Sequence, residues 1–164
     1  MYLAAYVCLL ITLFAALAGA AIGTAQLFQG KHSELRWLEY AQGAGSLCLL
    51  VSSGILMYAF VVSDFSVDYV ANYTDRALPL FYRCTAFWGG HEGSMLFWAL
   101  MVSVCGTAFL FTRTYRSLST ETRSWFLVFF LTIMAFFGLL LSTWSNPFLV
   151  SVPAPADGQG LNPL

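Results

Sequence analysis

The residues best suited to chemistry in this chain lie in one segment, Phe87-Trp88-Gly89-Gly90-His91-Glu92-Gly93-Ser94. This segment leads directly into an apolar run. A neutral imidazole can ligate a metal or a heme iron, and a neighbouring carboxylate can orient such a group or balance its charge. Glycines allow the backbone to approach a ligand closely or to turn tightly. We therefore take as candidate cofactor contacts Trp88, Gly89, Gly90, His91 and Glu92.

The same segment also has a purely structural interpretation. One histidine supplies half of a bis-histidine site, and the second histidine, His32, falls in a different connection of the chain. Ser94 fits the N-cap of the helix that follows, and the positive end of that helix would suit an anionic group such as a propionate. We expect neither a metal site nor a catalytic residue, and a structural role for His91 stays open as the alternative.

The residue pattern does not support several other chemistries. The cysteines Cys8, Cys48, Cys84 and Cys105 form no CxxC pair, so the sequence indicates neither a zinc site nor a thioredoxin-like motif. No Ser-His-Asp arrangement or phosphate-binding glycine loop can be assembled from it. The net charge of −1 and the lack of a basic stripe argue against a nucleic-acid partner.

The elements that must position the candidate site are membrane helices. Apolar residues make up 59% of the chain and charged residues 9%, whereas soluble proteins carry about 25% charged residues. Because a helix needs roughly 20 apolar residues to cross the hydrocarbon and satisfies its own backbone hydrogen bonds, the long uncharged runs predict transmembrane helices. We predict an all-α integral membrane protein with about four such helices, at 2–28, 41–62, 94–111 and 125–144.

The distribution of Lys and Arg predicts the orientation of these helices. The first connection holds Lys31 and Arg36, and the third holds three arginines, whereas the longer second connection holds Arg76 and Arg83. The positive-inside rule then places the N-terminus, the 63–93 loop and the tail outside the cytoplasm. No Lys or Arg precedes the first span, so we expect a retained helix and not a cleaved signal peptide. The predicted spans contain no charged residue, which argues against a small multi-span transporter.

The chain divides into a predicted transmembrane region, 1–145, and an external tail rich in Pro and Gly, 146–164. We expect the 63–93 loop to be structured, with a short strand or extended stretch where polar and apolar residues alternate between Asp64 and Val70. In the first span, Ala15, Gly19 and Gly23 are four residues apart, which predicts a face for close helix packing.

Several segments resemble the N-terminal region of the CcmF/NrfE family, in the family's order and over nearly the whole chain. Those in the loop are Asp64-Phe65-Ser66-Val67-Asp68-Tyr69-Val70-Ala71, Ala77-Leu78-Pro79-Leu80-Phe81-Tyr82 and Trp88-Gly89-Gly90-His91-Glu92-Gly93-Ser94. Those in the tail are Ser145-Asn146-Pro147-Phe148, Pro153-Ala154-Pro155-Ala156-Asp157-Gly158 and Gly160-Leu161-Asn162-Pro163-Leu164.

The resemblance implies an integral protein of the bacterial inner membrane that acts in cytochrome c maturation. Family members are similar to heme lyase components, which take heme from a periplasmic carrier and join it to the CxxCH cysteines of apocytochrome c. The NrfE branch serves cytochrome c nitrite reductase, and the sequence fits either branch. The implied partners are the remainder of the heme lyase, the heme carrier, apocytochrome c and the lipid membrane, and the implied cofactor of the full assembly is a b-type heme.

Family members are several times longer, and their tryptophan-rich heme-handling motif and heme-ligating histidines lie downstream of the matched region. We therefore expect an N-terminal piece, as a split-gene subunit, a truncated reading frame or a fragment. Alone it should neither bind heme stably nor act as a catalyst. Two functions stay open: a membrane segment that helps to deliver and attach heme, or a membrane scaffold that docks partner subunits without touching heme.

Overall fold

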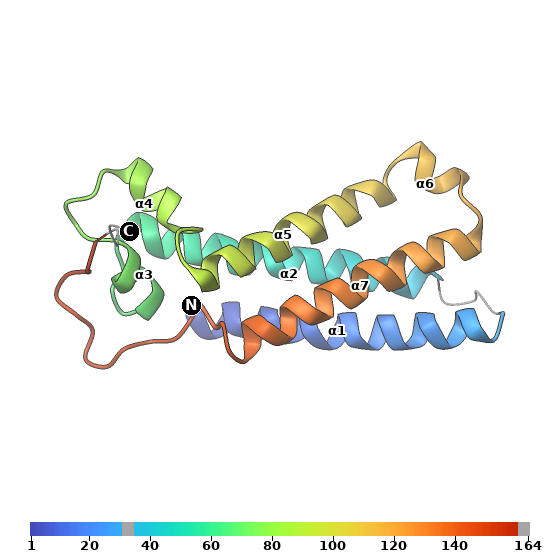
Figure 1. The fold of residues 1–164 in the computed structure, drawn as a ribbon, viewed down its shortest axis with the longest axis horizontal. Coiled ribbons are helices and arrows are strands. Elements are labelled where there is room, and N and C mark those ends of the chain that lie inside the picture. Colours follow the sequence, from blue (N-terminus) through green and yellow to red (C-terminus); the bar gives the residue numbers. More distant parts are fainter. Residues whose placement is uncertain (31–34, 161–164) are drawn as a thin grey trace.

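A computed structural model describes residues 1–30 and 35–160 as an elongated helical bundle (Figure 1). Lys31, His32 and the matched segment Leu161-Asn162-Pro163-Leu164 lie outside the described residues. The helices are α1 (Tyr2–Phe28), α2 (Leu35–Val62), α3 (Asp68–Tyr73), α4 (Leu80–Ala86), α5 (His91–Leu110), α6 (Arg113–Ser117) and α7 (Thr120–Ser142). Of these, α1, α2, α5 and α7 are long and apolar enough to cross a membrane. The predicted all-α membrane fold is confirmed.

Three of the long helices begin several residues before the apolar runs do. The first turns of α2, α5 and α7 start at Leu35, His91 and Thr120 and contain polar or charged residues. Backbone hydrogen bonding extends a helix beyond the part that hydrocarbon can accept, so a hydropathy pattern alone places the start too late. At the start of α7, the Ser119 hydroxyl accepts a hydrogen bond from the Thr122 N–H at 3.2 Å, as an N-cap does.

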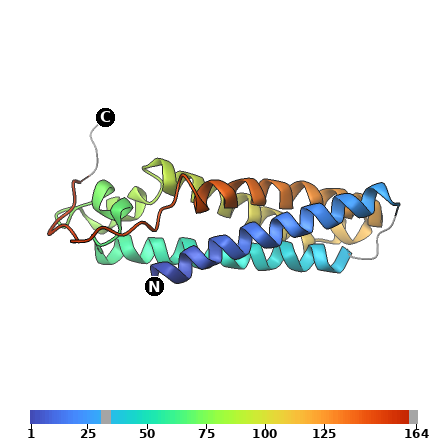
Figure 2. The same ribbon diagram turned by 90° about the horizontal axis from the view of Figure 1, so that it is seen from below.

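Helix α1 packs along α2 and α7 (Figures 1 and 2). Its small residues allow the close approach that their spacing predicts. A Cβ added to Gly19 would lie 2.8 Å from Cδ1 of Leu131 on α7, and one added to Gly23 would lie 2.7 Å from Cδ2 of Leu38 on α2. The absence of these side chains brings the helix backbones together, which is how small residues stabilise helix pairs in a membrane.

Polar residues join α2 to its neighbours inside the bundle. The Ser52 hydroxyl donates to the Ala5 carbonyl at 2.9 Å, and the Ser46 and Thr107 hydroxyls lie 2.6 Å apart between α2 and α5. The Gln42 amide, fully buried, donates to the Ser103 carbonyl at 3.2 Å. Interhelical hydrogen bonds of this kind fix the register of apolar helices, which dispersion forces alone leave poorly defined.

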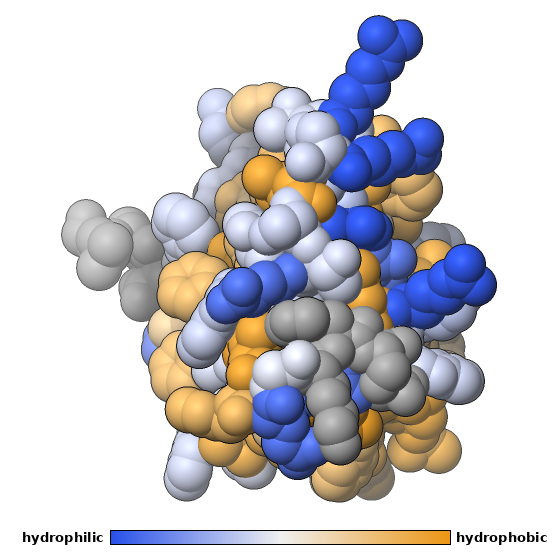
Figure 3. All heavy atoms as spheres, turned by 90° about the vertical axis from the view of Figure 1, so that its right-hand side faces the viewer, coloured by the Kyte–Doolittle hydropathy of each residue, from blue (hydrophilic) through white to orange (hydrophobic). Residues whose placement is uncertain are grey.

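The two ends of the bundle differ. The short helices α3 and α4 and the C-terminal segment lie together at one end, and α6 lies at the other (Figure 1). Hydrophilic side chains gather on the α6 end (Figure 3), where Arg113 and Arg116 are exposed. There, Arg123 of α7 pairs with Glu39 of α2 at 2.6 Å.

The short strand or extended stretch predicted at 64–70 is wrong. Residues 68–73 form α3, and extended pairing in the described part of the chain is limited to one antiparallel bridge between Val67 and Val150. Phe65, Val67 and Tyr69 are nevertheless all buried. The alternation therefore records which side chains point inward. The alternation does not imply a β-ladder, because the tail pairs with this segment only at the single bridge between Val67 and Val150.

Candidate functional site

The C-terminal segment 146–160 lies against α3 and the residues just before it, which are some 80 positions earlier in the chain. The N–H of Asp68 donates to the Leu149 carbonyl at 3.0 Å, and the N–H of Ser151 donates to the Ser66 carbonyl at 3.0 Å. Further on, the N–H of Gln159 donates to the Ala71 carbonyl at 2.7 Å. These bonds make the tail, expected to be a simple extended segment, part of a folded end of the bundle.

The turn from α4 into α5 is built around Tyr69. Its buried hydroxyl donates to the Phe87 carbonyl at 3.1 Å and accepts from the Gly90 N–H at 3.0 Å. Burial raises the pKa of Tyr69 well above its ordinary value, so the hydroxyl keeps the proton that it donates. The Tyr73 ring packs against the Tyr69 ring with their centroids 4.8 Å apart.

Two of the predicted glycines are needed for this aromatic packing. A Cβ added to Gly90 would lie 2.6 Å from Cε2 of Tyr73, and a Cβ added to Gly93 would overlap the carbonyl oxygen of Phe87. Gly90 also serves as the N-cap of α5, so the predicted N-cap at Ser94 is wrong. The Ser94 hydroxyl instead donates to the Trp88 carbonyl at 2.8 Å and closes the turn from the other side.

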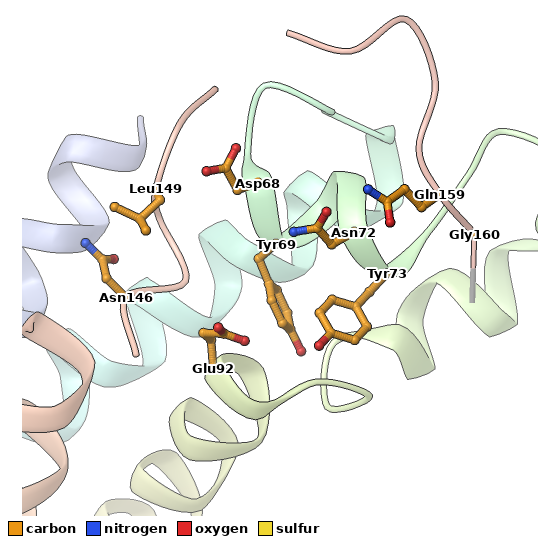
Figure 4. Close-up of a pocket in the computed structure, with 9 residues that line it drawn as sticks. All are labelled: Asp68, Tyr69, Asn72, Tyr73, Glu92, Asn146, Leu149, Gln159 and Gly160. Carbon is orange, nitrogen blue, oxygen red and sulfur yellow. The ribbon is translucent and has the colours of Figure 1, made fainter. Parts of the chain in front are cut away.

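A cleft of about 500 Å³ opens between α3, the first turn of α5 and the tail (Figure 4). Glu92 comes from α5, Tyr69 and Tyr73 from α3, and Gln159 from the tail. The carboxylate of Glu92 makes no hydrogen bond or ion pair with any residue that the structure describes. The complete lining is Asp68, Tyr69, Asn72, Tyr73, Glu92, Asn146, Leu149, Gln159 and Gly160.

The candidate residues of the Trp88–Glu92 segment do not share one surface. Glu92 lines the cleft, whereas His91 is exposed and is not part of its lining. Trp88 faces elsewhere: its ring lies 5.9 Å from that of Phe97, in a shallow aromatic hollow of about 240 Å³ that also includes Trp98. Gly89 is exposed in the turn.

The residues of the cleft do not fit a heme. The lining contains no histidine, and its carboxylates at Asp68 and Glu92 would repel the propionates of a heme. Within residues 1–30 and 35–160, no three His, Cys, Asp or Glu side chains come together as metal ligands. Carboxylate, amide and phenol groups at a partly open cleft are instead suited to the backbone and basic side chains of a polypeptide.

Sequence reasoning missed Tyr69 and the tail as parts of this site. The signal available for Tyr69 was its spacing to Tyr73, because residues four apart lie on one helix face. For the tail, Gly158 could have been a clue: a Cβ there would overlap the Thr74 carbonyl oxygen, so the backbones touch. Neither signal identifies its partner, which lies far away in the sequence.

No protein-family model matches the chain. Among curated proteins, it is 40% identical to the cytochrome c-type biogenesis protein NrfE of Haemophilus influenzae, over 73% of this chain and 18% of that protein. It is 43% identical to CcmF of Pseudomonas fluorescens, over 78% of this chain and 20% of that protein. It is 35% identical to CcmF of Escherichia coli, over 89% of this chain and 21% of that protein.

A solved structure has the same arrangement. The cytochrome c heme lyase CcmF matches with a TM-score of 0.78 and 26% identity, over 90% of this chain and 24% of that one. The chain therefore spans about a fifth of the length of the curated relatives that it matches.

Proposed function

We propose that this chain, which matches a portion of the CcmF/NrfE family of cytochrome c-type biogenesis proteins, helps to deliver and attach heme to apocytochrome c as the N-terminal membrane segment of a heme lyase. In this proposal the cleft receives apocytochrome c, and the remainder of the assembly binds the heme. The chain lies in the bacterial inner membrane with its N-terminus, the cleft and the tail in the periplasm. A heme carrier supplies the other substrate.

The observation that carries this proposal is the convergence of three separated segments on one cleft. Each of them resembles the family in sequence: 64–71 contributes Asp68 and Tyr69, 88–94 contributes Glu92, and 145–148 contributes Asn146. The chemistry of the lining supports a polypeptide as the occupant. The Glu92 carboxylate, which has no partner among the described residues, can bind a Lys or Arg side chain, and the amide groups of the lining can bind backbone amides.

The aromatic hollow supports a second, smaller role. The side chain of Trp88 is 47% exposed and that of Trp98 is 60% exposed, and both line the same side of α5. Two exposed indole rings offer a flat apolar surface at the edge of the membrane. In the full assembly this surface would lie against the heme edge or against a neighbouring helix, and it contributes no iron ligand.

A charge reversal at Glu92 tests the cleft. In cells whose c-type cytochromes depend on this chain, Glu92→Lys should lower the amount of covalently bound heme about fivefold or more, because a like charge would repel a basic polypeptide. Heme-dependent peroxidase staining of denaturing gels measures this amount. The matched control is Glu121→Lys, which reverses an exposed carboxylate at the opposite end of the bundle.

Two results of the same assay separate the alternatives. If Glu92→Lys leaves heme attachment unchanged while the chain remains in its complex, the cleft is not the apocytochrome site. If the variant removes the chain from the complex, the scaffold function is favoured. His91→Ala is a third arm: a complete loss of heme attachment with an intact complex would support His91 as a heme ligand and would contradict the assignment of heme to the rest of the assembly.

The orientation can be tested by cysteine labelling. In a variant whose four native cysteines are replaced by alanine, we expect Asn72→Cys at the cleft to react with a membrane-impermeant maleimide in intact spheroplasts. Arg113→Cys in α6 should react only after the membrane is permeabilised, because α6 belongs to the arginine-rich end. Gel-shift labelling measures both reactions, and the reverse pattern would overturn the proposed orientation.

A further inference from the structure

A membrane-facing groove lies between α2 and α5, at the end of the bundle opposite the cleft. Two hollows of about 580 and 430 Å³ form it, and they are continuous because both are lined by Gly43, Thr107 and Phe111. Space is open around Gly43, where an added Cβ would meet nothing within 4 Å. The groove therefore runs from the level of α6 down the sides of two membrane helices.

The rim of this groove is basic. Arg116 and Arg123 both line the part of the groove next to α6. The guanidinium of Arg116 is exposed and has no hydrogen bond or ion pair with the described residues. The guanidinium of Arg123 donates to Glu39 at 2.6 Å through Nη2, while its buried Nε has no partner.

The charges around this rim leave an excess of positive charge. Glu39 offsets one of the two arginines, and the Tyr115 hydroxyl is already bound to Glu39 at 2.8 Å. Burial raises the pKa of Tyr115 to about 12, so this group is neutral at pH 7. Among the described residues, the other charged groups of the neighbouring helix turns are Arg36, Arg113 and Glu121.

The part of the groove farther from α6 is apolar and exposed. Leu47 and Leu50 of α2 form one wall, and Val104 and Phe111 of α5 form the other. All four side chains are among the exposed large hydrophobic residues of the bundle. The basic rim lies at the ends of the membrane helices and suits an anionic phospholipid headgroup. The exposed apolar channel lies along the helices and suits an acyl chain.

We propose that this groove binds one anionic phospholipid. Its phosphate lies against the exposed guanidinium of Arg116, with Arg123 beside it in the lining of the groove, and an acyl chain follows the groove past Gly43 towards Leu50. A free phosphate would use the rim alone and leave the apolar channel without a role. A neutral phospholipid would fill the channel but would gain less from the excess positive charge. This proposal is independent of the function proposed for the cleft.

The test uses the full chain, purified in a neutral detergent. Native mass spectrometry measures binding of phosphatidylglycerol, of phosphatidylcholine with the same acyl chains, and of inorganic phosphate. We expect phosphatidylglycerol to bind in a one-to-one complex and to bind at least about fivefold tighter than phosphatidylcholine. Arg116→Gln should weaken phosphatidylglycerol binding about fivefold, which is the effect of one surface arginine on an anionic lipid. Arg113→Gln removes an arginine that is also exposed but lies outside the groove, and it should leave the affinity unchanged.

A second variant tests the channel without changing charge. Gly43→Leu fills the open space between α2 and α5 and should weaken binding of both phospholipids, with helix content by circular dichroism as the check on folding. Equal losses in Arg116→Gln and Arg113→Gln would show attraction to general surface charge and would overturn the site. Equal binding of inorganic phosphate, or unchanged lipid binding by Gly43→Leu, would also overturn it.

Discussion

Replacing Gly93 with alanine should destabilise the chain by about 1–3 kcal/mol or more, although it adds a single methyl group. Helix propensity alone predicts the opposite sign, because alanine is favoured over glycine in a helix by up to about 1 kcal/mol. The contact decides the outcome. The new Cβ would overlap the carbonyl oxygen of Phe87, and that carbonyl is bonded to the Tyr69 hydroxyl at 3.1 Å. The backbone cannot move away without breaking this bond.

Gly89→Ala is the matched control for this prediction. It adds the same methyl group to the same turn, but the nearest atom, the Ala86 carbonyl oxygen, would be 3.4 Å away, which is ordinary contact. Denaturation by SDS, followed by circular dichroism, measures the loss of stability for both variants. Equal stability of the two variants would show that the turn around Tyr69 is not rigid, and the cleft would then lose its fixed wall.

The sequence was sufficient to predict the long helices because their signal is local. Hydrocarbon demands a long uncharged run, and each run can be recognised without knowing its neighbours. The small-residue stripe with Gly19 and Gly23 was equally local, and it packs as predicted. What escaped prediction was how far the polar first turns extend each helix. The short helices α4 and α6 also escaped it, because segments of five to seven residues are too short to carry such a signal.

The candidate site was less predictable because it depends on contacts between distant segments. The sequence drew attention to His91, but the structure brings Glu92 into the cleft and leaves His91 outside it. The glycines were recognised as permitting a close approach, yet the group that approaches is the Tyr69–Tyr73 pair of the chain itself. A pattern of residue types can show that a backbone is crowded. It cannot show whether a ligand or another part of the protein crowds it.

At the α6 end, Glu39→Ala should destabilise the bundle by about 1.5–3 kcal/mol, the usual cost of losing hydrogen bonds to a charged group. One carboxylate oxygen of Glu39 accepts from Arg123 at 2.6 Å and from the Tyr115 hydroxyl at 2.8 Å, which ties together α2, α6 and α7. The paired side chains are 24% and 26% exposed. The loss of stability should therefore be larger than the loss from breaking a surface ion pair and smaller than the loss from breaking a fully buried one.

A double-mutant cycle separates this coupling from the loss of packing. Arg123→Ala alone leaves the Glu39 carboxylate with one donor, so the double variant should be more stable than the sum of the two single losses predicts. Tyr115→Phe is the conservative control, because it removes one donor and keeps the ring that packs 4.5 Å from the Arg123 guanidinium carbon. SDS denaturation of the full chain measures each corner of the cycle. Strict additivity would mean that Glu39 and Arg123 stabilise the bundle separately, and the ion pair would then have no part in holding α7 against α2.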